Sequence, residues 1–159
     1  MIYPQLLRAD FDRLPRPLRD FHSGTGHRMA SGTVCIRHAS FLARLLGFPP
    51  AGDNIPVKLE VFATEDREVW TRQFGNVSRR SVQWVRGGCL IESAGPVRVH
   101  FRVFLSDAGM KFESVRTGVW GIPLPLRISA TVRGLESAWE IDVRITAIGS
   151  YRGVMEPVA

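Results

Sequence analysis

The sequence predicts a mainly β (α+β) fold: an antiparallel curved sheet or partly closed β-barrel of about eight to nine strands, with one or two short helices covering or plugging it. Strand-like segments follow one another almost without interruption from residue 55 onward. The connections between them are short, and short connections join antiparallel neighbours because parallel strands need long crossovers. The best-patterned segments alternate apolar and polar side chains, which gives a sheet one buried face and one polar face.

We expect a single domain over residues 1–159, a length that can bury a sizeable core. Its apolar fraction of 45% is ordinary for a globular protein. Within it we expect a helical lead-in and loop at 1–27. A strand, a short helix and a proline turn should occupy 28–54, and an antiparallel β meander should fill 55–159.

The lead-in is predicted to be helical because Leu14, Leu18 and Phe21 recur at i, i+4 and i+7, which places them on one helical face. Pro17 fits the first turn of such a helix. The loop at 22–28 has glycines with the spacing of a phosphate loop. A strand-like segment follows it, however, whereas a phosphate cradle needs the N-terminus of a helix, so we predict a plain turn.

A second short helix is predicted over 38–46, where Phe41 and Leu45 form an i, i+4 apolar pair. Gly47 suits the left-handed position just after a helix, and Pro49 prevents the helix from continuing. A helix of about two turns is marginal by itself. We therefore expect it to be held by packing against the sheet.

Nearly all of the chain after residue 55 is predicted to be strand. The predicted segments are 55–64, 67–75, 77–86, 89–94, 97–106, 109–117, 126–133 and 138–147. Alternation is clearest in the fifth and last of these, and a one-residue slip would expose their apolar side chains, so the pattern specifies the register. Together with a strand expected before residue 38, such a series favours a curved sheet or a barrel, which hides its edges by closing.

The net charge of +6 is carried almost wholly by arginine, but the arginines are spread along the chain, so nucleic-acid binding is not favoured. No apolar run approaches the roughly 18 residues that span a membrane. The N-terminus carries acids where a signal peptide needs an apolar stretch, and we expect a cytoplasmic location. In that reducing compartment, Cys35 and Cys89 are expected to be two buried thiols.

Several motifs resemble an uncharacterised bacterial domain family. They are LPRPLRDFH at 14–22, the spacing of Gly24, Gly26, Arg28 and Gly32, LARLLGFPPAGDNIPV at 42–57, WTRQF at 70–74, GIPLP at 121–125 and YRG at 151–153. Members of that family occur alone or fused C-terminal to a saccharopine-dehydrogenase-like Rossmann oxidoreductase domain. The resemblance spans nearly the whole chain and implies a domain of unknown function without established catalytic residues. It also implies a separately encoded oxidoreductase as a partner.

Aromatic and arginine side chains on alternating strand positions indicate a candidate ligand site. Trp70, Arg72 and Phe74 share one face of their predicted strand. We expect the site where the predicted short helix, with Phe41 and Leu45, meets this strand. Such side chains can line an apolar cavity with a few polar anchors, stack on bases, or simply pack in a core.

A second candidate group is Arg98, His100 and Arg102, which share the polar face of one strand. Inside a concave sheet they would form a strip that recognises an anion, because arginine pairs well with carboxylate or phosphate. On a convex sheet they would be an ordinary solvated face. Glu140 and Asp142 share a polar face in the same way, and a charge ladder between strands is the simpler interpretation of that pair.

The preferred functional hypothesis is a non-catalytic binding domain that holds a small apolar or amphipathic ligand in the curved sheet, with arginines meeting an acidic head group. The alternatives are an accessory module for a Rossmann-type oxidoreductase and an enzyme that uses Glu140, Asp142 or His100. No cofactor is predicted. No metal site is predicted either, because His22 and His27 have no cysteine or carboxylate at the spacing of metal ligands.

Overall fold

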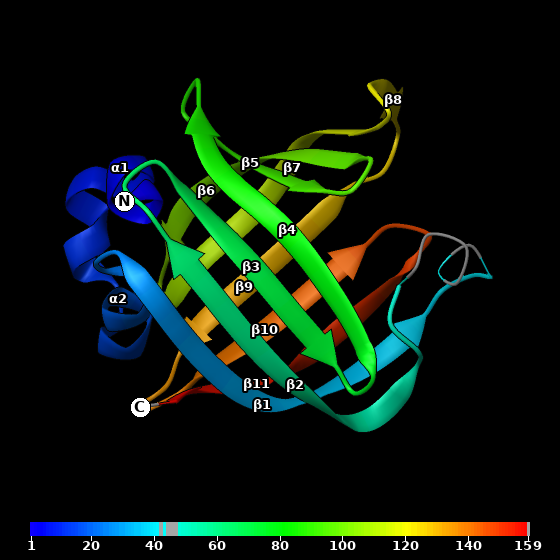
Figure 1. Ribbon diagram of the computed structural model, residues 1–159, viewed down its shortest axis with the longest axis horizontal. Helices are drawn as coiled ribbons and strands as arrows, with labels where there is room; N and C mark the ends of the chain where they lie inside the picture. The colour runs from blue at the N-terminus through cyan, green and yellow to red at the C-terminus, as the bar shows by residue number, and fades with distance from the viewer. Residues whose placement is uncertain (42, 44–47, 159) are drawn as a thin grey trace.

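The computed structural model describes residues 1–41, 43 and 48–158, and in this part of the chain eleven strands form one antiparallel sheet (Figure 1). In chain order they are β1 (Gly26–His38), β2 (Gly52–Ala63), β3 (Arg67–Phe74), β4 (Val77–Arg86), β5 (Cys89–Ala94), β6 (Val97–Ser106), β7 (Gly109–Val119), β8 (Ile122–Leu124), β9 (Ile128–Gly134), β10 (Trp139–Ile145) and β11 (Gly149–Val158). The predicted fold class, mainly β and antiparallel, is confirmed.

Ten of these strands close into a barrel. The strand order is β6-β5-β4-β3-β2-β1-β11-β10-β9-β7-β8, and a further pairing between β6 and β7 completes the ring. β8 lies outside the ring and pairs with β7. Closure leaves no strand edge within the ring unpaired, which removes the aggregation hazard of an open sheet.

Two short helices, α1 (Ile2–Leu7) and α2 (Arg16–His22), lie at one end of the barrel with a 3-10 segment, η1 (Arg8–Arg13), between them (Figure 1). Leu14, Leu18 and Phe21 are all buried, as their common helical face predicts. Pro17 stands in the first turn of α2. The helices therefore plug the barrel, and they do so with the apolar face that the sequence pattern indicates.

Two polar contacts fix this plug to the wall. The Tyr3 hydroxyl of α1 donates to Oε1 of Gln83 on β4, over 3.0 Å. Arg28 of β1 donates to the carbonyl oxygen of Phe21 at the end of α2 and pairs with Glu68 of β3 at 3.0 Å. Both contacts are buried or nearly so, and hydrogen bonds to charged groups in such places stabilise a structure more than neutral ones in water.

The predicted helix over 38–46 falls largely on positions 42 and 44–47, which lie outside the described residues. β1 extends to His38, and Ala39 donates a backbone hydrogen bond to Ile148 in the β10–β11 turn. Beyond the predicted segments, the sheet contains β8 and β11. Strand β11 was missed because Gly149, Gly153 and Pro157 are residue types that are depleted in strands.

Both cysteines are free thiols, as expected, but the expectation that they are buried is wrong, because each is only partly buried. Cys35 lies beside the exposed ion pair of Arg37 and Asp53, and its Sγ donates to the Asp53 carboxylate at 3.0 Å. Cys89 is the first residue of β5, directly after the turn at Gly87.

Among the described residues, no helix is both long enough and apolar enough to cross a membrane.

The seam between β1 and β11 depends on glycine. A Cβ added to Gly32 would lie 1.9 Å from the carbonyl oxygen of Val154, and one added to Gly153 would lie 2.0 Å from that of Thr33. Both distances are far inside van der Waals contact, and the atoms that would be struck belong to backbone. A side chain at either glycine therefore forces the two strands apart.

We predict that Gly32→Ala destabilises the protein by at least about 1–3 kcal/mol, the usual cost of overpacking. The matched control is Gly52→Ala, whose added Cβ would meet only the flexible end of the Ile55 side chain at 3.3 Å. The control should change the free energy of unfolding by less than about 0.5 kcal/mol. Urea unfolding followed by circular dichroism measures both, and equal midpoints for the two variants would contradict the close approach of the strands.

Candidate functional site

The barrel encloses a cavity of about 340 Å3 whose walls come from every strand of the ring. Most of the lining is aliphatic or aromatic. Representative wall residues are Val34, Leu59, Val99, Phe101, Phe112 and Met155. Tyr3, Phe21 and His22 from the helical plug also line it, so the plug forms the floor. Exposed Arg79 and Ala94 line the cavity too, which places its opening at the end away from the helices.

Strand β3 contributes the polar chemistry of the wall. Glu68, Trp70, Arg72 and Phe74 alternate along it, and period-two alternation turns all four toward the interior. Trp70 and Phe74 are buried, and the Arg72 guanidinium lies over the Trp70 ring at 4.7 Å from its centroid. A guanidinium over an indole face is a stabilising cation–π contact.

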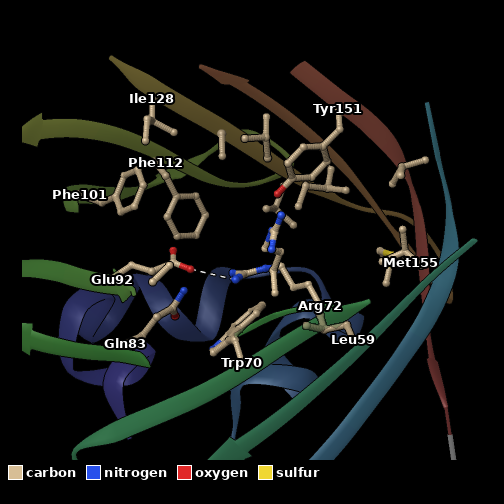
Figure 2. A pocket seen from close by; sticks show the side chains of 18 of the residues that line it. Leu59, Trp70, Arg72, Gln83, Glu92, Phe101, Phe112, Ile128, Tyr151 and Met155 are labelled. Atoms are coloured by element: carbon tan, nitrogen blue, oxygen red, sulfur yellow. Dashed lines mark hydrogen bonds and ion pairs between the residues drawn. The ribbon is translucent and has the colours of Figure 1, made fainter. Parts of the chain in front are cut away.

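Arg72 forms an ion pair with Glu92 inside the barrel (Figure 2). Its Nη1 donates to Glu92 Oε1 at 2.9 Å and to the Ser81 hydroxyl at 2.8 Å, and that hydroxyl donates to Glu92 at 2.6 Å. About a fifth of each charged side chain remains accessible, 22% for Arg72 and 20% for Glu92. Because both residues line the cavity, the pair presents a polar spot on an otherwise apolar wall.

The charges of this pair are balanced within the wall. Burial acts to raise the pKa of Glu92, but Arg72, the Ser81 hydroxyl and the Gln83 amide outweigh it and hold that pKa below its usual value. Burial likewise acts to lower the pKa of Arg72, and Glu92 outweighs it. Glu92 is therefore ionised and Arg72 protonated, which makes the polar spot neutral as a whole.

Two further groups complete the interior. Figure 2 shows the Tyr151 hydroxyl directed into the cavity from β11, and burial raises the pKa of this phenol. Glu68 pairs with Arg28 and accepts the Trp70 indole N–H at 2.9 Å. Burial raises the pKa of Glu68, while Arg28 and Trp70 act in the opposite direction. This second pair joins β1 and β3 at the floor, next to the plug.

His22 lines the cavity, and its side chain is buried among aromatic rings. Its ring lies 4.0 Å from that of Tyr3 and stacks on Trp70 with centroids 6.0 Å apart. Burial, and secondly the positive charge of Arg28, lower the pKa of His22 to about 3. The imidazole is therefore neutral at physiological pH, and its Nδ1 makes no hydrogen bond.

The structure brings together some of the residues that the sequence nominates. Trp70, Arg72 and Phe74 all line the cavity. Phe41 does not; its side chain is 80% exposed. Leu45 lies outside the described residues. The site consequently involves the predicted strand, but it faces the barrel interior and the N-terminal plug.

Arg98, His100 and Arg102 occupy the other face of β6. The alternate residues Val97, Val99 and Phe101 line the cavity, so these three side chains point outward from the barrel. They therefore do not form an anion-binding strip inside a concave sheet.

The carboxylates of β10 show the same orientation. Ile141, Val143 and Ile145 of that strand face the cavity, which turns Glu140 and Asp142 outward. Glu140 lies 3.9 Å from Arg152 of the neighbouring strand, and Asp142 pairs with Arg144 at 3.1 Å.

Along the described ranges 1–41, 43 and 48–158, no three His, Cys, Asp or Glu side chains are grouped as a metal ion would require.

Sequence reasoning missed several lining residues, chiefly Glu92, Gln83, Tyr151 and His22. On β4 the apolar Val82 and Trp84 suggest the inward face, yet Ser81 and Gln83 are the buried pair, each 3% exposed. His22 and Tyr151 each stand in a segment that resembles the uncharacterised family, LPRPLRDFH and YRG. Because both residues stand in motifs of the same family, the sequence could have suggested that His22 and Tyr151 lie in one site.

A family model described as a domain of unknown function, DUF4166, matches residues 14–152 of the chain. The match includes every lining residue discussed above except Tyr3 and Met155. No curated protein and no solved structure matches the chain. The fusion to a Rossmann domain implied by the sequence resemblance stays a prediction.

We predict that stability falls as the pH is lowered from 6.5 to 5 because of His22. In the unfolded chain this imidazole binds a proton near pH 6.5, whereas the folded protein resists protonation until about pH 3. The unfolded state therefore binds more protons in this window, and the contribution is about 1.5 kcal/mol. His22→Phe should remove that part of the slope, while the control His27→Gln, at an exposed position, should keep it. Identical pH profiles for His22→Phe and the wild type would show that His22 is not buried as described.

We also predict strong coupling between Arg72 and Glu92. Arg72→Met leaves a buried carboxylate without its partner and should cost about 3–5 kcal/mol. Glu92→Gln in the same background removes that charge and should recover part of the loss. A double-mutant cycle by chemical denaturation should give a coupling energy of about 0.5–3 kcal/mol, whereas strictly additive effects would mean that the two charges do not interact.

Proposed function

The chain belongs to the DUF4166 family of domains of unknown function, and we propose that it binds a small, mainly apolar ligand inside its barrel. The single observation that carries the proposal is the cavity of about 340 Å3 lined by apolar and aromatic side chains around one polar spot. Ligand sites are typically concave, mostly apolar and supplied with a few placed polar groups, in volumes of about 300–1,000 Å3.

The packing of the barrel supports this proposal. Protein interiors are normally close-packed, and a cavity lined by large apolar side chains loses their dispersion contacts. Here Phe101, Phe112 and Trp139 all border the cavity. An apolar ligand would restore those contacts and stabilise the folded state in proportion to its occupancy.

The polar spot indicates what the other end of the ligand would be. Nη1 of Arg72 donates hydrogen bonds to Glu92 and Ser81, whereas a guanidinium carries five N–H donors in all. An oxygen atom on the ligand could accept a hydrogen bond from one of the other N–H groups. Because Glu92 already balances the charge of Arg72, a carboxylate would add an uncompensated charge to an apolar site, which is costly. A neutral carbonyl or hydroxyl therefore suits the site better than the acidic head group expected from sequence.

The ionisable groups of the cavity favour binding over catalysis. A general base works best when its pKa lies near the working pH. His22 has a pKa of about 3, and Glu92 is held as a carboxylate by three donors. The carboxylates and histidine of the enzyme hypothesis, Glu140, Asp142 and His100, lie on the outer surface of the barrel.

We predict that Ala130→Phe weakens ligand binding by filling the cavity that Ala130 lines. The matched control is Thr131→Phe, one residue further along β9 and exposed on the outer face. The probe is the neutral, apolar dye N-phenyl-1-naphthylamine, whose fluorescence rises in an apolar site. The cavity variant should weaken its affinity at least about tenfold, and the control should match the wild type.

Competition then tests the polar end. Decanol should displace the dye at lower concentration than decanoate, because only decanoate brings a charge into the cavity. Unchanged dye affinity in Ala130→Phe would overturn binding inside the barrel. Stronger displacement by decanoate than by decanol would instead favour a ligand with an acidic head group.

A further inference from the structure

Two large apolar side chains are exposed where β7 turns into β8. Trp120 is 81% exposed and Ile122 is 65% exposed. Trp120 has a φ of 49°, a left-handed conformation that is rare for a bulky residue, and Gly121 follows with a φ of 82°. We call residues 120–122 the apolar tip. These φ values belong to the two-residue turn that pairs Val119 with Ile122, and turns of this kind favour asparagine or glycine at the first position. An exposed tryptophan in that place is unusual, and such outliers suggest a function.

The tip stands beside the opening of the cavity. The Trp120 backbone N–H donates to the carbonyl oxygen of Pro96 at 3.0 Å, in the β5–β6 turn. Ala94 and Val97, on either side of that turn, line the cavity. Figure 1 shows β8 at the opposite end of the molecule from the helical plug. The apolar tip therefore borders the route by which a ligand would enter or leave.

A group of arginines lies next to the tip on the outer face. Outward-facing His100 pairs in register with Arg116 of β7, and Arg98 lies two residues before it on the same face of β6. Burial, and then the positive charges of Arg116, Arg98 and Arg86, lower the pKa of His100. All three are exposed, and within the described residues none of them forms an ion pair with a carboxylate. We call Arg98 and Arg116 the basic strip; Arg86, the last residue of β4, lies at the end of that strand away from Arg79 and is not part of it.

The basic strip and the apolar tip are continuous along the sheet. Arg98 pairs in register with Gly118 of β7, and Gly118 pairs with Pro123 of β8. Arg116 precedes the tip on its own strand, and Val115 next to it is 52% exposed. One side of the cavity mouth thus carries positive charge and large aliphatic and aromatic side chains together.

We propose that the apolar tip and the basic strip dock the barrel onto an anionic lipid surface, with the cavity mouth toward the lipid. Tryptophan favours the membrane–water interface, where one part of its ring is apolar and another is wet. Each arginine close to an anionic leaflet adds about 1 kcal/mol of attraction. Buried apolar area and charge attraction together determine such peripheral binding.

The chemistry of the tip favours lipid over nucleic acid as the anionic partner. Ile122 and Val115 have no flat face on which a base could stack, whereas aliphatic side chains insert readily into the boundary between head groups and acyl chains. Arginine by itself would suit phosphate on either partner, so the aliphatic side chains decide between them.

Sedimentation of the full chain with vesicles tests the docking surface. The protein should bind vesicles of 30% phosphatidylglycerol in phosphatidylcholine, bind pure phosphatidylcholine much more weakly, and lose affinity as salt rises. Arg98→Glu with Arg116→Glu should weaken binding at least about 25-fold, since about 1 kcal/mol per arginine corresponds to roughly fivefold. The charge-matched control is Arg13→Glu with Arg16→Glu, at the plugged end, which should stay within about threefold of the wild type.

Trp120→Ala tests the apolar tip without changing the net charge. It should weaken vesicle binding about tenfold, and the blue shift of tryptophan fluorescence that accompanies binding should be lost in this variant and kept in Trp139→Phe, whose ring is buried inside the barrel. Thermal unfolding checks that each variant is folded. Ala130→Phe should bind vesicles like the wild type, so the docking surface and the ligand cavity can fail separately.

Three outcomes would overturn the proposal. The first is equal binding to neutral and anionic vesicles, and the second is no binding to either. The third is tighter binding to a single-stranded RNA oligonucleotide than to anionic vesicles, with RNA affinity also lost in Trp120→Ala. The surface would then be a binding site for nucleic acid.

Discussion

Closure of the ring is the constraint on which the rest of the structure depends. β1 and β11, from opposite parts of the chain, pair over ten residues, and their approach is close enough that only glycine fits at Gly32 and Gly153. A second closure joins β6 to β7. With both in place every strand of the ring has two neighbours, and the inward faces of ten strands surround one interior space. That space is the candidate site, so the site exists only because the ring closes.

The interior is apolar, and this makes its few polar groups informative. Arg72 and Glu92 neutralise one another, Glu68 and Arg28 do the same near the floor, and His22 stays uncharged. Away from Arg79 at the opening, the charges of this interior balance, which keeps the desolvation penalty of each ion small relative to an unpaired one. The outer surface differs, because there the arginines carry the excess positive charge of the chain. The molecule therefore combines a neutral interior with a basic outer surface.

Much of the fold could be predicted because alternation is a local property. Val97, Val99 and Phe101 face inward as their spacing indicates, and Leu14, Leu18 and Phe21 form the buried face of the plug. Less of the site could be predicted. On β4, Val82 and Trp84 compete with Ser81 and Gln83 for the inner face, and alternation fits either choice. The polar pair faces inward because Tyr3, Arg72 and Glu92 satisfy its hydrogen bonds there, and those partners lie far apart in the sequence.

The sequence by itself determined most of the strands, their antiparallel order, the apolar face of the N-terminal helix and the common face of Trp70, Arg72 and Phe74, because periodicity and turn chemistry act over a few residues. Only the tertiary structure decided that the sheet closes, that β11 supplies Tyr151 to the interior, and that Arg98 and His100 face outward. Curvature selects which face of a strand is concave, and curvature arises from pairing between distant strands. The partners of a buried charge are likewise chosen by the fold, since burial and proximity across the barrel have no local signature.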